Sequence, residues 1–172
     1  MSGLPLHPMV VHLPLALAVF APILMGILTW GVVRGKWRAS TWWLAVLLQA
    51  IVFVSALTAA NLGERDEEAV ETIIAENVIE AHEEWGQKLV WASGLLLAAS
   101  LVPFFFKKRA VPLAVVTAIS LISLFVALKT GHSGGELVYR HGAAAAFSGG
   151  GTNLSPSSDQ RRDQAGEEDY DN

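Results

Sequence analysis

Four long apolar stretches dominate the pattern of hydrophobic and polar positions along this chain. They cover residues 9–33, 42–60, 89–106 and 111–128. Each is close to the length of about 20 residues that a helix needs to cross the core of a bilayer. Polar connections separate the stretches, so the pattern predicts an all-α integral membrane protein built as a four-helix bundle in the lipid bilayer.

The connection at residues 64–84 is longer than the other two, and it is both acidic and periodic. It holds nine acidic residues against a single base, Arg65. Apolar residues recur in it at steps of three and four: Val70, Ile73, Ile74, Val78 and Ala81. This spacing predicts an amphipathic connector helix on the outer surface. A solvated connector is the simplest interpretation, and a docking surface for a basic partner is the alternative.

The end of the chain has a different composition from the apolar part. From Thr152 onward, Leu154 is the only large aliphatic residue among Ser, Asp, Gln, Arg and Glu. Such a segment cannot bury enough apolar surface to offset the entropy lost on ordering. We therefore expect a four-helix transmembrane domain at residues 1–145 and a disordered polar tail at residues 146–172.

Charged residues sort by connection and predict the topology. The two short connections hold only bases: Arg34, Lys36 and Arg38 in the first, and Lys107, Lys108 and Arg109 in the third. All sixteen acidic residues lie in the second connection or after Lys129. The positive-inside rule then places both basic loops in the cytoplasm and both termini outside. The first apolar stretch lacks a preceding basic region, so we interpret it as a retained helix and not a signal peptide.

Composition narrows the chemistry. The mean hydropathy of +0.42 and the 52% share of hydrophobic residues are too high for an ordinary soluble domain. The chain has no cysteine, which excludes disulfides, thiolate-bound iron–sulfur clusters and covalent c-type haem. Neither a basic surface with interleaved aromatics nor a phosphate-binding loop occurs, so we expect no nucleic-acid partner.

All five histidines fall at the predicted outer end of the bundle: His7, His12, His82, His132 and His141. A histidine in or beside a membrane span is costly unless it is partnered, and neutral imidazole is a good ligand for haem iron, zinc and copper. The glycine pair Gly134-Gly135 predicts a tight reversal, with residues 137–139 briefly extended. That reversal would fold His141 back over the mouth of the bundle.

These histidines predict a cofactor site, with haem b as the first expectation. We expect His12 and His82 to be the primary ligands, His141 to come next, and His7 and His132 to be alternates. Phe20 and Trp91 would line a flat slot, and three outer cations would pair with the haem propionates or simply extend to the interface: Lys88, Lys129 and Arg140. No histidine occurs in the inner half of any predicted helix, so we expect one haem.

Zinc or copper without a redox role is the alternative for the same cluster. His12, His82 and His141 would then be the metal ligands, with Glu83, Glu84 or Glu136 as added carboxylates. No H-E-x-x-H helix occurs, so hydrolysis is disfavoured. Whether the chain is an enzyme stays open. A further alternative is an accessory or anchoring subunit that binds no cofactor.

Three motifs resemble the DUF2231 family, an uncharacterised group of four-helix bacterial membrane proteins. They are His7-Pro8 with His12-Leu13-Pro14, His82 at the third helix, and the run from Gly134 to Gly142, GGELVYRHG. The resemblance covers residues 4–145 and implies a bacterial cytoplasmic membrane protein similar to membrane b-type cytochromes. Because relatives are joined to Rieske or cytochrome c modules, it also implies electron transfer at the outer face. From this and the histidines we expect a haem subunit that passes electrons between a quinone and a periplasmic electron carrier, as part of a larger membrane complex.

Overall fold

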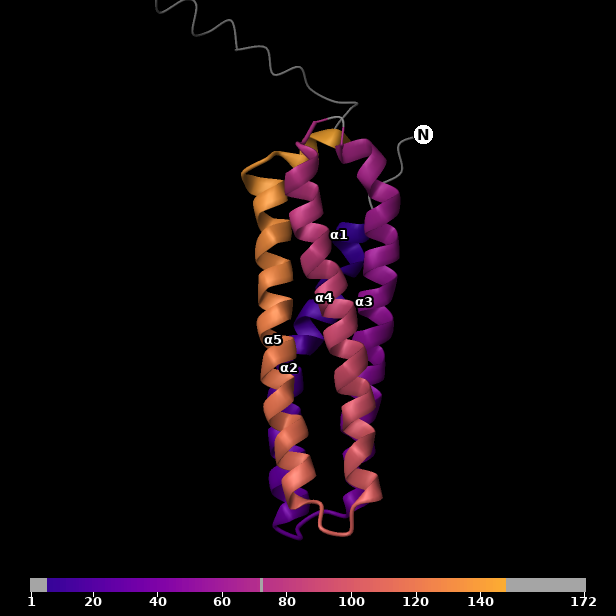
Figure 1. Cartoon of the computed structure of the whole chain (residues 1–172), viewed down its shortest axis with the longest axis vertical. Helices are drawn as coiled ribbons and strands as arrows, with labels where there is room; N and C mark the ends of the chain where they lie inside the picture. The colour runs from indigo at the N-terminus through magenta and orange to yellow at the C-terminus, as the bar shows by residue number, and fades with distance from the viewer. Residues whose placement is uncertain (1–5, 72, 148–172) are drawn as a thin grey trace, which may run out of the picture.

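The computed structural model describes residues 6–71 and 73–147, and the fold is all-α (Figure 1). Its α-helices are α1 (His7–Val10), α2 (His12–Val33), α3 (Trp43–Val70), α4 (Glu76–Leu101) and α5 (Ala110–Tyr139). Short 3-10 helices are η1 (Ala39–Trp42), η2 (Val102–Phe105) and η3 (Ala143–Phe147). The predicted all-α four-helix architecture is confirmed. Of the predicted disordered tail, residues 146–147 belong to η3 and the rest lies outside the described residues.

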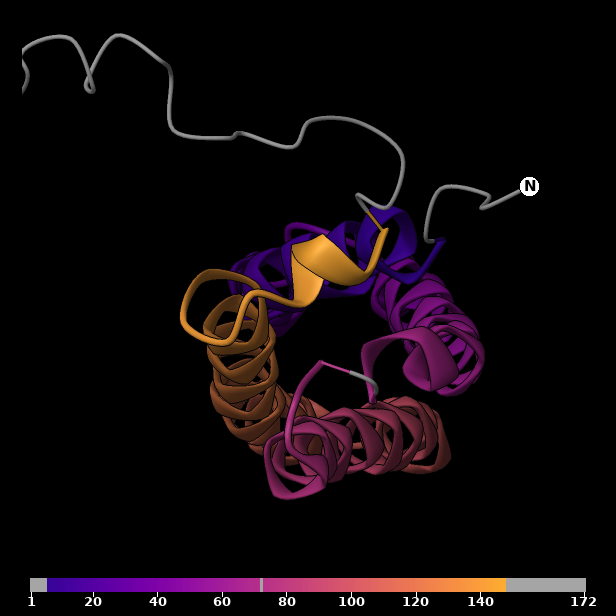
Figure 2. The same ribbon diagram turned by 90° about the horizontal axis from the view of Figure 1, so that it is seen from above.

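Four segments of the described chain are long and apolar enough to cross a membrane. They are His7–Val33, Ala39–Glu67, Glu76–Phe105 and Ala110–Tyr139, and each has 27 to 30 residues. Each long helix packs against two others, in the cyclic order α2, α3, α4, α5, and Figure 2 shows this ring from above. The helices are longer than the apolar stretches because their polar ends continue in helical conformation.

Small and polar residues make up much of the bundle interior, and many large apolar side chains lie outside. Ala18, Ala56 and Ala127 pack with Leu89 in one buried cluster. By contrast, Trp91 is 70% exposed on the bundle surface and Phe20 is 61% exposed. Such a distribution suits a bilayer, where lipid covers large side chains and small residues let helices approach closely. The predicted slot lined by Phe20 and Trp91 is therefore wrong.

The acidic connection is helical, but it forms no separate helix. α3 continues to Val70 and α4 begins at Glu76, so the reversal takes only the few residues between them. Three of the five periodic apolar residues pack at this end of the bundle, whereas Ile73 and Ala81 are exposed. Ile74 and Ile79 form a buried cluster with Leu137 of α5 and Ala143 of η3. This cluster joins three segments at the end of the bundle, which explains the periodicity.

The predicted reversal at Gly134-Gly135 is also wrong. Both glycines lie within α5, which stays helical to Tyr139. The turn comes later, at Gly142, whose φ of +73° belongs to the left-handed region that glycine tolerates. A Cβ on Gly134 would lie 3.0 Å from Cε1 of His82, so this glycine permits close approach and not a turn. His141 is exposed beside the actual turn.

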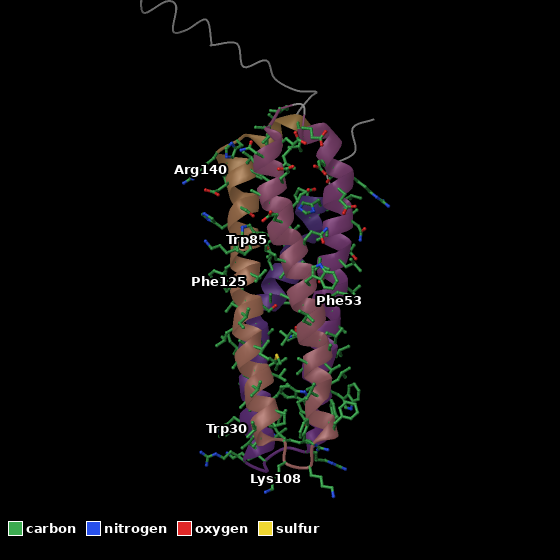
Figure 3. All side chains as sticks on the ribbon, viewed as in Figure 1. Trp30, Phe53, Trp85, Lys108, Phe125 and Arg140 are labelled. Atoms are coloured by element: carbon green, nitrogen blue, oxygen red, sulfur yellow. The ribbon has the colours of Figure 1, made fainter. Side chains whose placement is uncertain are left out.

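Charged residues separate between the two ends of the bundle. In Figure 3, Lys108 lies at one end and Arg140 near the other. Because consecutive spans are antiparallel, the other basic loop, with Arg34 and Lys36, lies at the end of Lys108. The acidic ends of α3 and α4 lie at the end of Arg140. We call these the basic end and the acidic end.

Candidate functional site

Two histidines from distant parts of the sequence meet inside the acidic end of the bundle. The ring centres of His7 in α1 and His82 in α4 are 6.1 Å apart, and the ring planes are nearly perpendicular at 82°. Both residues are half-buried. His7 lies at the helix start that Pro8 favours, because a proline in the first turn has no amide proton to leave unbonded.

The His7 ring is held by α3. Its Nδ1 atom lies 2.7 Å from the carbonyl oxygen of Ala59, and its backbone N–H donates to Oδ2 of Asp66 over 3.2 Å. Because a carbonyl oxygen only accepts, Nδ1 carries the proton of the neutral ring. Gly63 provides the room, since a Cβ there would lie 3.2 Å from Nδ1 and from Cε1 of His7.

The His82 ring is held by α5 in a similar way. Its Nδ1 atom lies 2.8 Å from Oγ of Ser133, and that hydroxyl donates to the carbonyl oxygen of Thr130 over 3.0 Å. Since its proton is committed to Thr130, the hydroxyl accepts from Nδ1–H of His82. The Thr130 hydroxyl in turn donates to the carbonyl oxygen of Trp85 over 2.9 Å. This network ties α4 to α5 directly behind the ring.

These contacts give both rings the same tautomer. Nδ1 of His7 and Nδ1 of His82 are protonated and bonded to the surrounding helices, so Nε2 of each neutral ring keeps its lone pair. Within the described part of the chain, neither Nε2 atom has a hydrogen-bond partner, and no fully buried side-chain nitrogen or oxygen is left unpaired. A metal-bound histidine typically donates its other N–H to a protein oxygen in this manner.

The remaining predicted ligands lie apart from this pair. The side chains of His12, His132 and His141 are exposed, and Nε2 of His132 lies 3.7 Å from Oε1 of Glu136. His12 follows His7 by five residues, a rotation of about 140° around a helix, so it presents another face. In residues 6–71 and 73–147, no three His, Asp or Glu side chains gather as a metal site. The ligand roles of these residues stay predictions.

The three predicted rim cations have partners on the outside of the bundle. Lys88 bonds to Glu84 over 2.8 Å, and Arg140 bonds to Glu136 over 2.6 Å. Nζ of Lys129 lies 5.9 Å from the centre of an aromatic ring one turn before it. These contacts match the alternative in which the cations extend to the interface. Their role as propionate partners stays a prediction.

Sequence reasoning missed the residues that hold the two rings. Three of them lie where the apolar pattern ends one span and begins the connector: Ala59, Gly63 and Asp66. Ser133 and Gly134 belong to the predicted turn. A detectable signal was the run Gly131-His132-Ser133-Gly134, in which small residues continue the helical register of the fourth span. Such a stripe predicts close approach of a neighbouring helix.

The apolar spans and the internal polar site define a multi-pass membrane protein with a four-helix bundle fold. The chain belongs to the DUF2231 family of predicted membrane proteins, whose model matches residues 3–146. That match covers all four spans and nearly all of η3, and it confirms the family resemblance. Comparison with curated proteins and with solved structures gives no match.

Proposed function

We propose that this protein binds one haem b between His7 and His82 and carries electrons at the acidic end of the bundle. The observation that supports the proposal most directly is the pair of imidazoles, each fixed through Nδ1 and each with a free Nε2 atom. The pair differs from the one expected from sequence, since His7 takes the place of His12. Histidine is among the side chains that hold haem iron in proteins.

The separation of the rings suits two ligands on one metal ion. An imidazole nitrogen binds a metal at about 2.0 Å, and its ring centre lies about 1.2 Å further away. Two imidazoles that hold one ion would therefore have their ring centres no more than about 6.4 Å apart. The observed separation of 6.1 Å is within this reach.

The number of protein ligands favours haem over zinc or copper. Zinc takes four protein ligands in structural sites and three in catalytic sites, and Cu(II) prefers four nitrogen or oxygen ligands in a plane. Among the described residues, no third His, Asp or Glu joins the pair in a group that could hold a metal ion. A haem supplies four nitrogens of its own and needs two from the protein, which is the number available here.

The protein's own residues would orient the ligands and exclude water. Ala59 and Ser133 hold the two rings in the ligating tautomer, and Gly63 and Gly134 let the rings lie close to α3 and α5. A bound haem would supply one-electron redox chemistry. By the positive-inside rule the acidic end faces outward. We therefore propose a membrane quinone and a periplasmic carrier as electron partners, within a larger membrane complex.

An absorption spectrum tests this function. The protein is expressed with added haem precursor and purified in detergent. We expect a Soret band, sharp α and β bands on reduction, and one haem per chain. His7→Ala and His82→Ala should each lose these bands, and the matched control His12→Ala should keep them.

Two other outcomes would contradict the proposal. A colourless protein with stoichiometric zinc or copper by elemental analysis would support the non-redox metal site. A colourless, metal-free protein would support the accessory subunit, in which the same hydrogen bonds only join helices.

A further inference from the structure

A second feature lies at the opposite end of the bundle, where α2 and α5 leave an apolar groove between them. The groove has a volume of about 490 Å³. One face of α2 lines it through Gly26, Thr29, Trp30 and Val33, and the start of α5 lines it through Ala110, Val111 and Ala114. The groove is hollow because several of its lining residues are small: a Cβ on Gly26 would meet nothing within 4 Å.

The loop after α2 folds back and brings cations to the mouth of this groove. Gly35 adopts a φ of +67°, which a glycine accommodates without strain. The backbone N–H groups of Lys36 and Trp37 then donate to the carbonyl oxygen of Gly31 over 3.0 and 3.1 Å. As a result, Nζ of Lys36 lies 4.3 Å from the ring centre of Trp30, which lines the groove.

Charge distinguishes this groove from a second one at the acidic end. Arg34 lines the first groove directly, and Lys36 lies over its Trp30 wall. The second groove also lies between α2 and α5, with a volume of about 330 Å³, but it is lined by His132 and apolar residues and by no lysine or arginine. Of these two grooves, the first therefore combines an apolar channel at membrane depth with cations at the interface.

We propose that this groove binds an anionic phospholipid. One acyl chain lies along Gly26 and Ala114, and the phosphate is held by Arg34 and Lys36 at the interface. The apolar walls select a hydrocarbon chain, and the two cations select a negative headgroup, because each Lys or Arg near the membrane surface attracts anionic lipid. Trp30 is an interfacial aromatic that fixes the depth of the glycerol region. The proposal is independent of the histidine pair.

Native mass spectrometry tests the proposal. The detergent-purified full chain is equilibrated with equal amounts of phosphatidylglycerol and phosphatidylcholine that carry identical acyl chains. We expect phosphatidylglycerol to be retained preferentially, and Arg34→Gln with Lys36→Gln to reduce that preference by about fivefold per cation. Gly26→Leu fills the groove and should reduce retention of both lipids. Its fold is checked by circular dichroism, and the open space at Gly26 makes the change tolerable.

Lys107→Gln with Lys108→Gln is the matched control, because these lysines share the basic end but do not line the groove. We expect this control to keep the preference. An equal loss in the control would mean general charge attraction and would overturn the site. Equal retention of both lipids by the wild type, or unchanged retention in a folded Gly26→Leu variant, would also overturn it. Retention of a quinone or of a second chain in the groove, in place of lipid, would do the same.

Discussion

The two ends of the bundle are built from the same helices but place ionisable side chains differently. At the acidic end, two imidazoles lie between the helices and are bonded to α3 and α5. At the basic end, the interior is filled by Met25, Leu28 and Trp42, and the charges lie outside. The acidic end therefore holds potential ligands, whereas the basic end holds a packed apolar core. This difference explains why we expect one haem and not two.

The largest effect should come from the packed end. Trp42 is 1% exposed, and its Nε1–H donates to the carbonyl oxygen of Ser100 over 2.8 Å. Trp42→Ala should lower the free energy of unfolding by about 3–5 kcal/mol, because it leaves a cavity and an unpaired carbonyl. The neighbouring Trp43→Ala is the control. Because Trp43 is 55% exposed and stacks on Phe104, this change should lower the free energy of unfolding by only about 0.5–1.5 kcal/mol. Thermal unfolding in detergent measures both, and equal losses would show that the basic end is not packed as described.

The next effect distinguishes two adjacent glycines at the acidic end. Gly134→Ala places a methyl group 3.0 Å from Cε1 of His82 and should cost about 1–3 kcal/mol through overpacking. A Cβ on Gly135 would meet nothing within 4 Å, so Gly135→Ala should be neutral or stabilise the helix by about 0.5–1 kcal/mol. Thermal unfolding and haem content are the measurements. If both variants behave alike, Gly134 does not serve the His82 ring.

A smaller effect should follow from loss of the bond behind His82. Ser133→Ala removes the acceptor of Nδ1–H and should lower stability by about 0.5–1.5 kcal/mol. If haem is bound, its affinity should fall about tenfold or more, since the ring orientation is no longer fixed. Ser133→Thr keeps a hydroxyl and should restore much of the affinity. Haem transfer to apomyoglobin measures the haem affinity. An unchanged transfer rate in Ser133→Ala would contradict the proposed role of the bond between Ser133 and His82.

The smallest effect should come from the outer cations. Lys88 and Glu84 form an exposed pair on the surface of α4. Because water and salt screen such pairs, Lys88→Gln should leave the melting temperature unchanged within error. It should also leave haem content unchanged, if Lys88 serves the interface and not a propionate. A clear loss of haem in this variant would instead show that Lys88 contributes to the cofactor site.

The sequence predicted the spans well because membrane thickness dictates the length of an apolar run. It also singled out His82, since a histidine at the start of a span needs a partner, and the structure places the His7 ring beside it. It did not predict that His7 would be that partner, because the choice between His7 and His12 depends on how α1 is rotated against α3. The Ala59 carbonyl and the Asp66 carboxylate set that rotation, and neither contact is visible in a hydropathy pattern.

The two errors about glycine and the connector have a common physical origin. A glycine pair favours a turn when considered alone, but in a membrane bundle it also permits close packing. Gly134 lies in a helix and leaves room for the His82 ring. The periodic residues after Val70 predicted a surface helix. Ile74 instead packs in a buried cluster with Leu137 and Ala143, which lie far away in the sequence, and Val78 packs against that cluster. Local patterns specify an amphipathic face, but not what covers it.

The most direct test of the central claim is electron paramagnetic resonance of the ferric protein. The imidazole planes of His7 and His82 are 82° apart, and two histidine nitrogens on the iron of a bound haem would give a low-spin ferric signal. We predict that signal in the wild type and in His12→Ala, and its loss in His7→Ala. A high-spin wild type, or an unchanged low-spin signal in His7→Ala, would contradict ligation by the His7 and His82 pair.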